Sequence, residues 1–405
     1  MLNSKSVPFI PYGRQCIDET DVEAVTAVLR SDFLTTGPAV AEFEGALKAH
    51  VDAPYAIVCA SGTAALHLAA MVLDFEPGDI AIVPSVTFAA TANAIRYVGG
   101  EVVFADVDPT TGLMRSEDFK AALARTGKHK VKAVLPVLLA GQGADIVQIA
   151  ERAAEYDIKV VEDASHAIGT RYKSNGKEFS VGACAHSDLT VFSFHPVKTV
   201  AMGEGGAITT RSEAYAERLA RLRAHGIERE AGRFVQRDMA SAQDGTANPW
   251  YYELQELGFN YRATDIQCAL GASQLRKLDG FVQRRATLVE RYDRLLAEQA
   301  PTAQPNRRTP GFTPGWHLYA VRINFEALGR SRADVMRELR ARGIGTQVHY
   351  IPLHLQPYYR GRYGEQSLPG AERYYAQSLT LPLFPDLTEK EQDRVVAALA
   401  EILRS

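Results

Sequence analysis

Several features that mark particular classes of protein are scarce in this sequence of 405 residues. Its four cysteines, Cys16, Cys59, Cys184 and Cys268, are widely scattered and form no CxxC pair. Such cysteines are typical of a reduced, cytoplasmic protein with mostly buried thiols, and we single out no metal site. Charge of one sign is also lacking, because 45 Lys and Arg stand against 48 Asp and Glu. A net charge of −3 predicts no general attraction to nucleic acid.

Long apolar runs are missing too, because charged residues interrupt each one before it could span a bilayer. The first residues, MLNSKSVPFIPYGRQ, carry prolines where a secretory signal has its apolar core, so we expect no signal peptide. No GxGxxG motif follows the first predicted strand, which argues against a dinucleotide-dependent oxidoreductase. The composition, 46% hydrophobic and 23% charged, is that of an ordinary globular protein, expected in the cytoplasm without a membrane or nucleic-acid partner.

What the chain does contain is a long alternation of short apolar runs and helical segments. A helix with Asp18 as its N-cap is expected over residues 18–31, and a charged amphipathic helix over residues 211–224. Between them lie the apolar runs AIVCA, IAIVPS, VVFADV, KAVLPVLL, IKVVED, LTVFSF and GGAITT. Strands that alternate with helices predict an α/β domain on a mostly parallel sheet with both faces covered.

The sequence changes in character after this alternation. The polar segment 226–255 has no periodicity and predicts a long ordered loop, which a helix over residues 264–297 follows. HLYAVRIN and TQVHYIP are predicted to be strands and SRADVMRELRARG a helix, and the last helix starts with a capping box at Thr388. We therefore predict a large domain, residues 1–275, and a small C-terminal α+β domain, residues 276–405.

Four local features lie where strands of the predicted sheet end, which is where ligands collect in an open parallel sheet. In AIVCASGTAAL, the free N–H groups of a helix start, next to Gly62 and Thr63, would suit a phosphate. An ordinary tight turn with a helix cap explains the same residues. Phe88, in SVTFAAT, is placed to stack on a flat heterocycle, although most phenylalanines in such positions belong to the core.

The other two features carry ionisable groups. VVEDASHA ends a buried strand with Asp163, and a pyridinium nitrogen is one cationic partner for such a carboxylate. A helix cap or a structural ion pair is the more common explanation. LTVFSFHPVKTVAMGEGGAITT places Lys198 after an apolar strand, where the amine loses its proton more easily than in water and can condense with an aldehyde. The alternative for Lys198 is a solvated surface lysine. In the same segment, Ser193 is positioned to add a hydroxyl to the phosphate site.

The order of these features is that of a fold-type I enzyme dependent on pyridoxal 5′-phosphate (PLP). The chain resembles the DegT/DnrJ/EryC1/StrS family of sugar-nucleotide aminotransferases over nearly its whole length. The motifs that carry the resemblance are LTTGPAVAEFE, SGTAAL, PSVTFAAT, VEDASHAIGT, SFHPVKTVAMGEGGA, LGFNYRATDIQCALG and VHYIPLHLQPYY. It implies an aspartate aminotransferase-like fold, a homodimer with shared active sites, PLP as cofactor, and transfer of the amino group of L-glutamate to a nucleotide-linked keto-sugar.

The resemblance also implies a role for each matching residue. Lys198 is expected to bond the cofactor and to move protons, and Asp163 to pair with the pyridine nitrogen. Dehydrases of the family have a histidine in place of the lysine, so Lys198 favours amino transfer. In LLAGQ the aromatic residue of many relatives is missing, which leaves the role of Gln142 open. The other implied contacts are Phe88 on the ring, His166 near the ring hydroxyl, Gly62, Thr63, Ser193 and the second subunit's Asn260 at the phosphate, and Thr36, Tyr350 and His354 on the substrate side.

Within the family, residues 10–38 and 248–262 resemble the subgroup that serves the pseudaminic acid pathway. That subgroup aminates C4 of UDP-2-acetamido-2,6-dideoxy-β-L-arabino-hex-4-ulose. The alternatives are a UDP-linked D-4-keto sugar of the bacillosamine type, GDP-4-keto-6-deoxymannose, a dTDP-sugar and an 8-keto octulosonate. A catalytically silent sugar-nucleotide sensor on the same fold is a further alternative, against which the presence of both Lys198 and Asp163 argues.

Overall fold

A computed structural model of the chain describes residues 8–127, 129–143 and 145–404. Its central sheet has the strand order β1-β9-β8-β5-β4-β2-β3, in which β9 runs antiparallel to both of its neighbours and the other adjacent pairs are parallel. The α/β fold on a mostly parallel sheet is therefore confirmed. The strands are β1 (Tyr55–Cys59), β2 (Ile80–Pro84), β3 (Glu101–Ala105), β4 (Val131–Val134), β5 (Lys159–Asp163), β8 (Leu189–Ser193) and β9 (Gly206–Thr210).

Both faces of this sheet are covered, because alternate residues of its strands belong to different hydrophobic clusters. In β1, Ile57 packs into one cluster and Val58 into the other. The first cluster is formed with α3 (Gly62–Val72), α4 (Ala89–Tyr97), α5 (Ser116–Ala124), α6 (Ile146–Ala154) and α7 (Glu213–Leu222). The second is formed chiefly with α2 (Pro38–Val51) and α9 (Asp265–Arg276).

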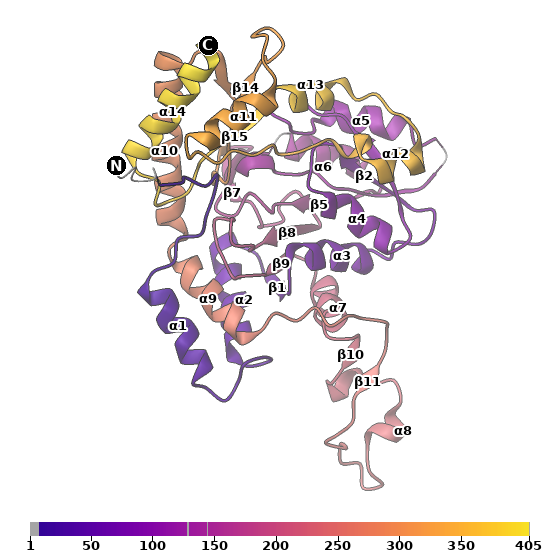
Figure 1. Cartoon of the computed structure of the whole chain (residues 1–405). Helices are drawn as coiled ribbons and strands as arrows, with labels where there is room; N and C mark the ends of the chain where they lie inside the picture. The colour runs from indigo at the N-terminus through magenta and orange to yellow at the C-terminus, as the bar shows by residue number, and fades with distance from the viewer. Residues whose placement is uncertain (1–7, 128, 144, 405) are drawn as a thin grey trace.

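A separate hydrophobic cluster lies in the C-terminal part of the chain. There a three-stranded antiparallel sheet packs against long helices, and Figure 1 shows α10 and α14 side by side. The predicted capping box is present, since Thr388 Oγ1 donates to the Glu391 carboxylate and accepts from the Glu391 N–H. The placing of a domain boundary at residue 275 stays a prediction. The elements are α10 (Leu278–Gln299), β12 (Ala303–Pro305), β14 (Tyr319–Ile323), α11 (Arg332–Ala341), β15 (Ser378–Leu381) and α14 (Glu389–Arg404).

The remaining elements connect these two parts. Asp18 caps α1 as predicted, by accepting from the N–H groups of Thr20 and Asp21. No helix in the described part of the chain is long and apolar enough to cross a membrane. The connecting elements are α1 (Glu19–Leu29), η1 (Leu139–Gly141), β6 (Arg171–Ser174), β7 (Lys177–Ser180), β13 (Phe312–Thr313), η3 (Leu353–Leu355), α12 (Pro357–Tyr363) and α13 (Pro369–Gln377).

One prediction of secondary structure is wrong and another is confirmed. The segment TQVHYIP forms only an isolated bridge between Gln347 and Thr380. Its backbone then leaves that sheet edge, and the N–H of Leu353 donates to Ser85 O just after β2, so a continuous ladder is not possible. The helical pattern predicted from Thr264 to about Ala297 is confirmed, and it forms α9 and α10 with Lys277 between them. Lys277 forms an ion pair with Asp21 in α1.

The polar segment after α7 is an arm, residues 225–260, that projects away from the body of the molecule (Figure 1). Most of it is irregular, as the sequence predicts. It contains a two-residue antiparallel ladder between β10 (Ile227–Glu228) and β11 (Glu253–Leu254), the short helix α8 (Arg237–Ala240) and the turn η2 (Ala231–Arg233).

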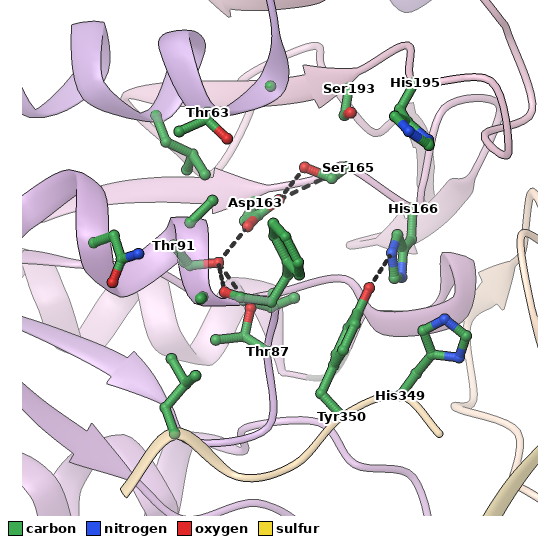
Figure 2. Close-up of a pocket in the computed structure, with 18 of the residues that line it drawn as sticks. Thr63, Thr87, Thr91, Asp163, Ser165, His166, Ser193, His195, His349 and Tyr350 are labelled. Carbon is green, nitrogen blue, oxygen red and sulfur yellow. Dashed lines mark hydrogen bonds between the residues drawn. The ribbon is translucent and has the colours of Figure 1, made fainter. Parts of the chain in front are cut away.

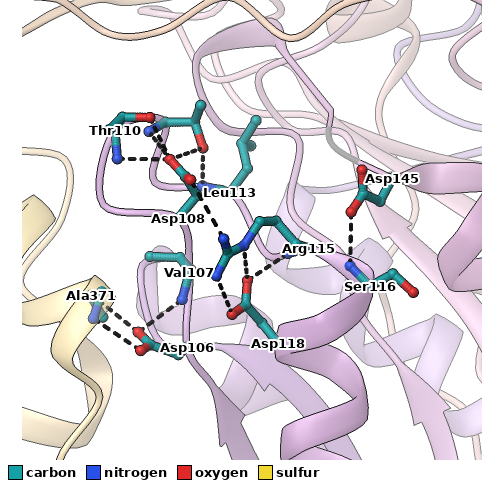
Figure 3. A network of polar contacts seen from close by, with 12 residues as sticks. Asp106, Val107, Asp108, Thr110, Leu113, Arg115, Ser116, Asp118, Asp145 and Ala371 are labelled. Atoms are coloured by element: carbon teal, nitrogen blue, oxygen red, sulfur yellow. Dashed lines mark hydrogen bonds and ion pairs between the residues drawn. The ribbon is translucent and has the colours of Figure 1, made fainter.

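A carboxylate far away in sequence caps helix α13. The residue before α13 supplies no side-chain cap, and Asp106, after β3, accepts instead from the N–H groups of Gly370 (2.9 Å) and Ala371 (2.7 Å). The same carboxylate accepts from its neighbour Val107 (2.9 Å). Figure 3 shows this network, which ties α13 to the edge of the central sheet.

We expect Asp106→Ala to lower the free energy of unfolding by about 1–2 kcal/mol, because two N–H groups of the first turn of α13 lose their acceptor. Urea unfolding followed by circular dichroism measures the change. Asp106→Asn keeps one acceptor oxygen and is expected to lose less. An alanine variant as stable as the wild type would show that water replaces the carboxylate without cost.

Candidate active site

A cavity of about 1130 Å³ opens at the carboxyl ends of β5 and β8. Its walls come from these strand ends, from the starts of α3 and α4, and from the segment 347–359. The sequence-predicted residues that line it are Gly62, Thr63, Phe88, Asp163, His166, Ser193, Lys198 and Tyr350.

One end of the cavity is built to hold an anion. Ser61 caps α3 by accepting from the Ala64 N–H (3.1 Å), so the N–H groups of Gly62 and Thr63 at the helix start remain available. Ser193 lies directly against this turn: a Cβ at position 62 would stand 2.7 Å from the Ser193 Cβ. Only glycine therefore allows the strand end and the helix start to come this close.

Asp163 ends β5 and is 4% exposed. One carboxylate oxygen accepts from Thr91 Oγ1 (2.7 Å), and the other from the N–H (3.1 Å) and Oγ (2.6 Å) of Ser165. Figure 2 shows the carboxylate held between these two residues. Among the described residues no lysine, arginine or histidine pairs with it, so the ion-pair explanation fails. A buried carboxylate with fixed direction and no protein cation suits a cationic ligand.

Lys198 follows β8 in the wall of the same cavity. Burial lowers the pKa of its ammonium to about 8, and the nearby Asp163 carboxylate opposes this shift. A solvated surface lysine would not show this change. A substantial fraction of Lys198 is therefore the neutral, nucleophilic amine at mildly alkaline pH.

His166 and Tyr350 form a neutral pair beside Lys198. The N–H of Ala140 donates to His166 Nδ1 (3.3 Å), so the ring proton sits on Nε2 and is donated to the Tyr350 hydroxyl oxygen (3.1 Å). Burial lowers the pKa of His166 well below its ordinary value and raises that of Tyr350. The Tyr350 O–H is thereby left free to donate into the cavity. Figure 2 shows the two side chains facing each other.

Phe88 does not belong to the hydrophobic core. Its side chain is 60% exposed, although its backbone occupies the N-cap position of α4. Its ring centroid lies 6.0 Å from that of Tyr350. An exposed aromatic ring inside a cavity is available for stacking on a flat ligand.

Three of the predicted residues do not line the cavity of this single chain. Thr36 is exposed and its hydroxyl donates to its own neighbour, Thr35 O (2.7 Å). Asn260 is exposed at the base of the arm. His354 is buried, with Nδ1 2.6 Å from Ser85 Oγ and Nε2 3.3 Å from Glu372. His354 thus anchors the segment that carries Tyr350 to the end of β2, and the ligand-binding roles of all three stay predictions.

Several lining residues were not found from the sequence. Thr91 could have been, because it lies three residues after Phe88 and so on the same face of α4. His349 could also have been, because it precedes Tyr350 in the motif VHYIPLHLQPYY. Tyr12 and His317 could not, because each comes from a distant segment and only the tertiary fold brings it to the cavity. Gln142 does not line the cavity; it is buried, and its side chain accepts from the Thr309 N–H (3.1 Å).

These residues fit PLP. The helix start and Ser193 match the phosphate, Phe88 the face of the ring, Asp163 the pyridine nitrogen, and Lys198 the aldehyde carbon. All four parts of the cofactor find matching residues within one cavity.

Comparisons with known proteins agree with this fit. The sequence model of the DegT/DnrJ/EryC1/StrS aminotransferase family matches residues 15–400. The spore coat polysaccharide biosynthesis protein SpsC of Bacillus subtilis is 34% identical, over 98% of this chain and 97% of SpsC. Helicobacter pylori PseC, an aminotransferase of pseudaminic acid biosynthesis, superposes with a TM-score of 0.86 at 26% identity, over 98% of this chain and 99% of PseC. Streptococcus pneumoniae Spr1654 in its PLP form reaches 0.85 at 28% identity, over 98% and 99%.

We expect acetic anhydride to acylate Lys198 in the cofactor-free protein with a midpoint near pH 8, because the nucleophile is the neutral amine. Surface lysines, with ordinary pKa values of about 10.4, should react half-maximally at higher pH. Peptide mass mapping measures both in one sample. Asp163→Asn removes the opposing charge and should shift the Lys198 midpoint to lower pH. A Lys198 midpoint equal to that of the surface lysines would contradict the desolvation argument.

Proposed function

This chain belongs to the DegT/DnrJ/EryC1/StrS aminotransferase family, and on that premise we propose that it moves the amino group of L-glutamate to C4 of UDP-2-acetamido-2,6-dideoxy-β-L-arabino-hex-4-ulose. It is a PLP-dependent sugar aminotransferase, which acts on a keto-sugar with an amino donor. The observation that carries the chemistry is the presence of Lys198 and Asp163 in one cavity. The pseudaminic subgroup motifs in residues 10–38 and 248–262, together with the likeness to PseC, support the choice of sugar.

Asp163, Phe88 and Lys198 each have a separate role in the reaction. When bound, PLP supplies an electron sink that stabilises negative charge on the carbon atom next to the amine. Asp163 keeps the pyridine nitrogen protonated, and Phe88 holds the ring plane. The Lys198 amine takes a proton from the amino-bearing carbon of glutamate and later delivers one to C4 of the sugar. Because it is partly neutral near its pKa of about 8, it can both accept and donate.

Tyr350 is assigned to the sugar side. Since Nε2–H of His166 already satisfies the Tyr350 oxygen, the phenol proton is available for the carbonyl oxygen at C4. The burial that raises the pKa of Tyr350 keeps this proton in place at working pH. The hydrogen bond polarises the carbonyl and so favours attack by the amine.

We assign a homodimer to this enzyme, with Asn260 of each chain completing the phosphate site of the other. The arm exposes apolar side chains that the single chain leaves uncovered, which is unusual for a monomer surface. A second copy of the chain would bury them, and Asn260 lies at the base of this surface. The exposed apolar residues of the arm are Val235 (77%), Met239 (62%), Trp250 (73%), Leu254 (67%) and Leu257 (80%).

The four cysteines of the chain are free and mostly buried, which makes the cytoplasm the expected compartment.

The substrate assignment is tested with a panel of keto-sugar nucleotides that includes the L-configured UDP-4-keto sugar and its D-epimer. Release of 2-oxoglutarate from glutamate is measured for each. We expect activity confined to the L-sugar, because the sugar pocket must reject epimers through fixed hydrogen bonds. Activity on another sugar alone would overturn the substrate and keep the chemistry. Absence of activity on the whole panel, with PLP bound, would favour a sensor.

The shared site is tested by mixing two inactive variants. Lys198→Ala should lower transfer by about 100- to 10,000-fold through loss of the proton-moving group, and Asn260→Ala should weaken PLP binding. Unfolded and refolded together, the two variants form mixed dimers in which one site is wild type, so activity should return. Each variant refolded alone is the control. Mixed dimers that are no more active than the mean of the two variants refolded alone would place Asn260 in its own subunit's site or outside it.

A further inference from the structure

The cavity continues beyond the residues that fit PLP, into a space between α4 and α12, which lie close together in Figure 1. Its outer end is lined by Asn93 and Tyr97 from α4 and by Gln356, Tyr358 and Tyr359 around α12. Helix α4 starts beside the cofactor end, and a rise of about 1.5 Å per residue takes its last turn roughly 13 Å away. The outer end is therefore a second binding region of the same cavity.

We propose that this outer end binds the base of the substrate's nucleotide, and that the Asn93 amide selects a base with a carbonyl at C4, as in uracil. The proposal rests on the proposed function in one respect, namely that the keto-sugar is linked to a nucleotide. It adds the residues that recognise the base.

Two exposed tyrosines give the outer end flat apolar faces. Tyr97 is 56% exposed and Tyr358 is 58% exposed, although both line the cavity. Each makes a T-shaped contact with a buried ring: Tyr97 with His67, at 5.4 Å between centroids, and Tyr358 with Tyr359, at 5.0 Å. Rings that are held in place by such contacts and remain partly exposed are suited to stacking on a planar base.

The Asn93 amide has a defined direction. Tyr359, which is 3% exposed, donates its O–H to Asn93 Oδ1 (2.7 Å). With the oxygen occupied, Nδ2 offers its two hydrogens to the cavity, and no described group accepts them. These donors match the carbonyl at C4 of uracil. They oppose cytosine, which presents an amino group at the corresponding position.

The two guanidinium groups near the outer end share one carboxylate. Glu101 forms ion pairs with Arg96 (2.8 Å) and with Arg362, and it accepts from the Tyr363 hydroxyl (2.8 Å). Both guanidinium groups are thus already engaged by a protein carboxylate. A neutral base suits this surface better than the diphosphate does.

Isothermal titration of the PLP-bound enzyme with UDP and with CDP tests the proposal. We expect UDP to bind at least about tenfold more tightly than CDP, since a donor facing a donor is strongly rejected. Asn93→Ala should weaken UDP binding and remove the preference. Tyr359→Phe, which keeps the ring and frees the amide to rotate, should also reduce the preference. Tyr97→Ala and Tyr358→Ala should each weaken UDP and CDP by about tenfold.

The matched control is Tyr156→Ala, an exposed tyrosine away from the cavity, which should bind both nucleotides like the wild type. Variants at Asn93, Tyr97 and Tyr358 that bind UDP like the wild type would overturn the base site while the proposed function stands. A wild-type enzyme that releases 2-oxoglutarate from glutamate but binds neither nucleotide would overturn the base site and the nucleotide linkage together, and leave amino transfer in place.

Discussion

The cost of burying charge governs the organisation of this protein. A lysine amine and a carboxylate both lie in one cavity, and neither has a conventional ion-pair partner among the described residues. The parallel pairing of β5 with β8 makes this possible, because it aligns Asp163 with Val191 and brings the two carboxyl ends of the strands together. The donors from Thr91 and Ser165, the glycine-lined turn before α3 and the neutral histidine beside Tyr350 all hold polar groups in the wall of this cavity.

How far the sequence predicted this site depended on the distance between the partners. Phe88, Asp163, Ser193 and Lys198 each follow directly from a strand end, so a local motif was enough to place them at one sheet edge. Helix caps such as Asp18 were predictable for the same reason. The capping of α13 was not, because its acceptor belongs to Asp106, 264 residues away from the N–H that it binds.

The segment TQVHYIP shows a second limit. Its β-branched and aromatic residues favour a strand, yet its hydrogen bonds join Gln347 to Thr380 at one end, while the N–H of Leu353 just beyond it donates to Ser85. Tertiary contacts at both ends override local propensity here.

One continuous stretch of chain, residues 347–359, contributes to both ends of the cavity. His349 and Tyr350 stand beside Lys198, whereas Tyr358 and Tyr359 stand at the outer end, and the anchor of His354 on Ser85 lies between them. The number of residues on either side of His354 therefore sets the spacing between the reacting centre and the outer end of the cavity. Insertions or deletions here would rescale the length of ligand that fits and leave the reaction itself intact, which gives evolution a way to change the substrate without rebuilding the catalytic end.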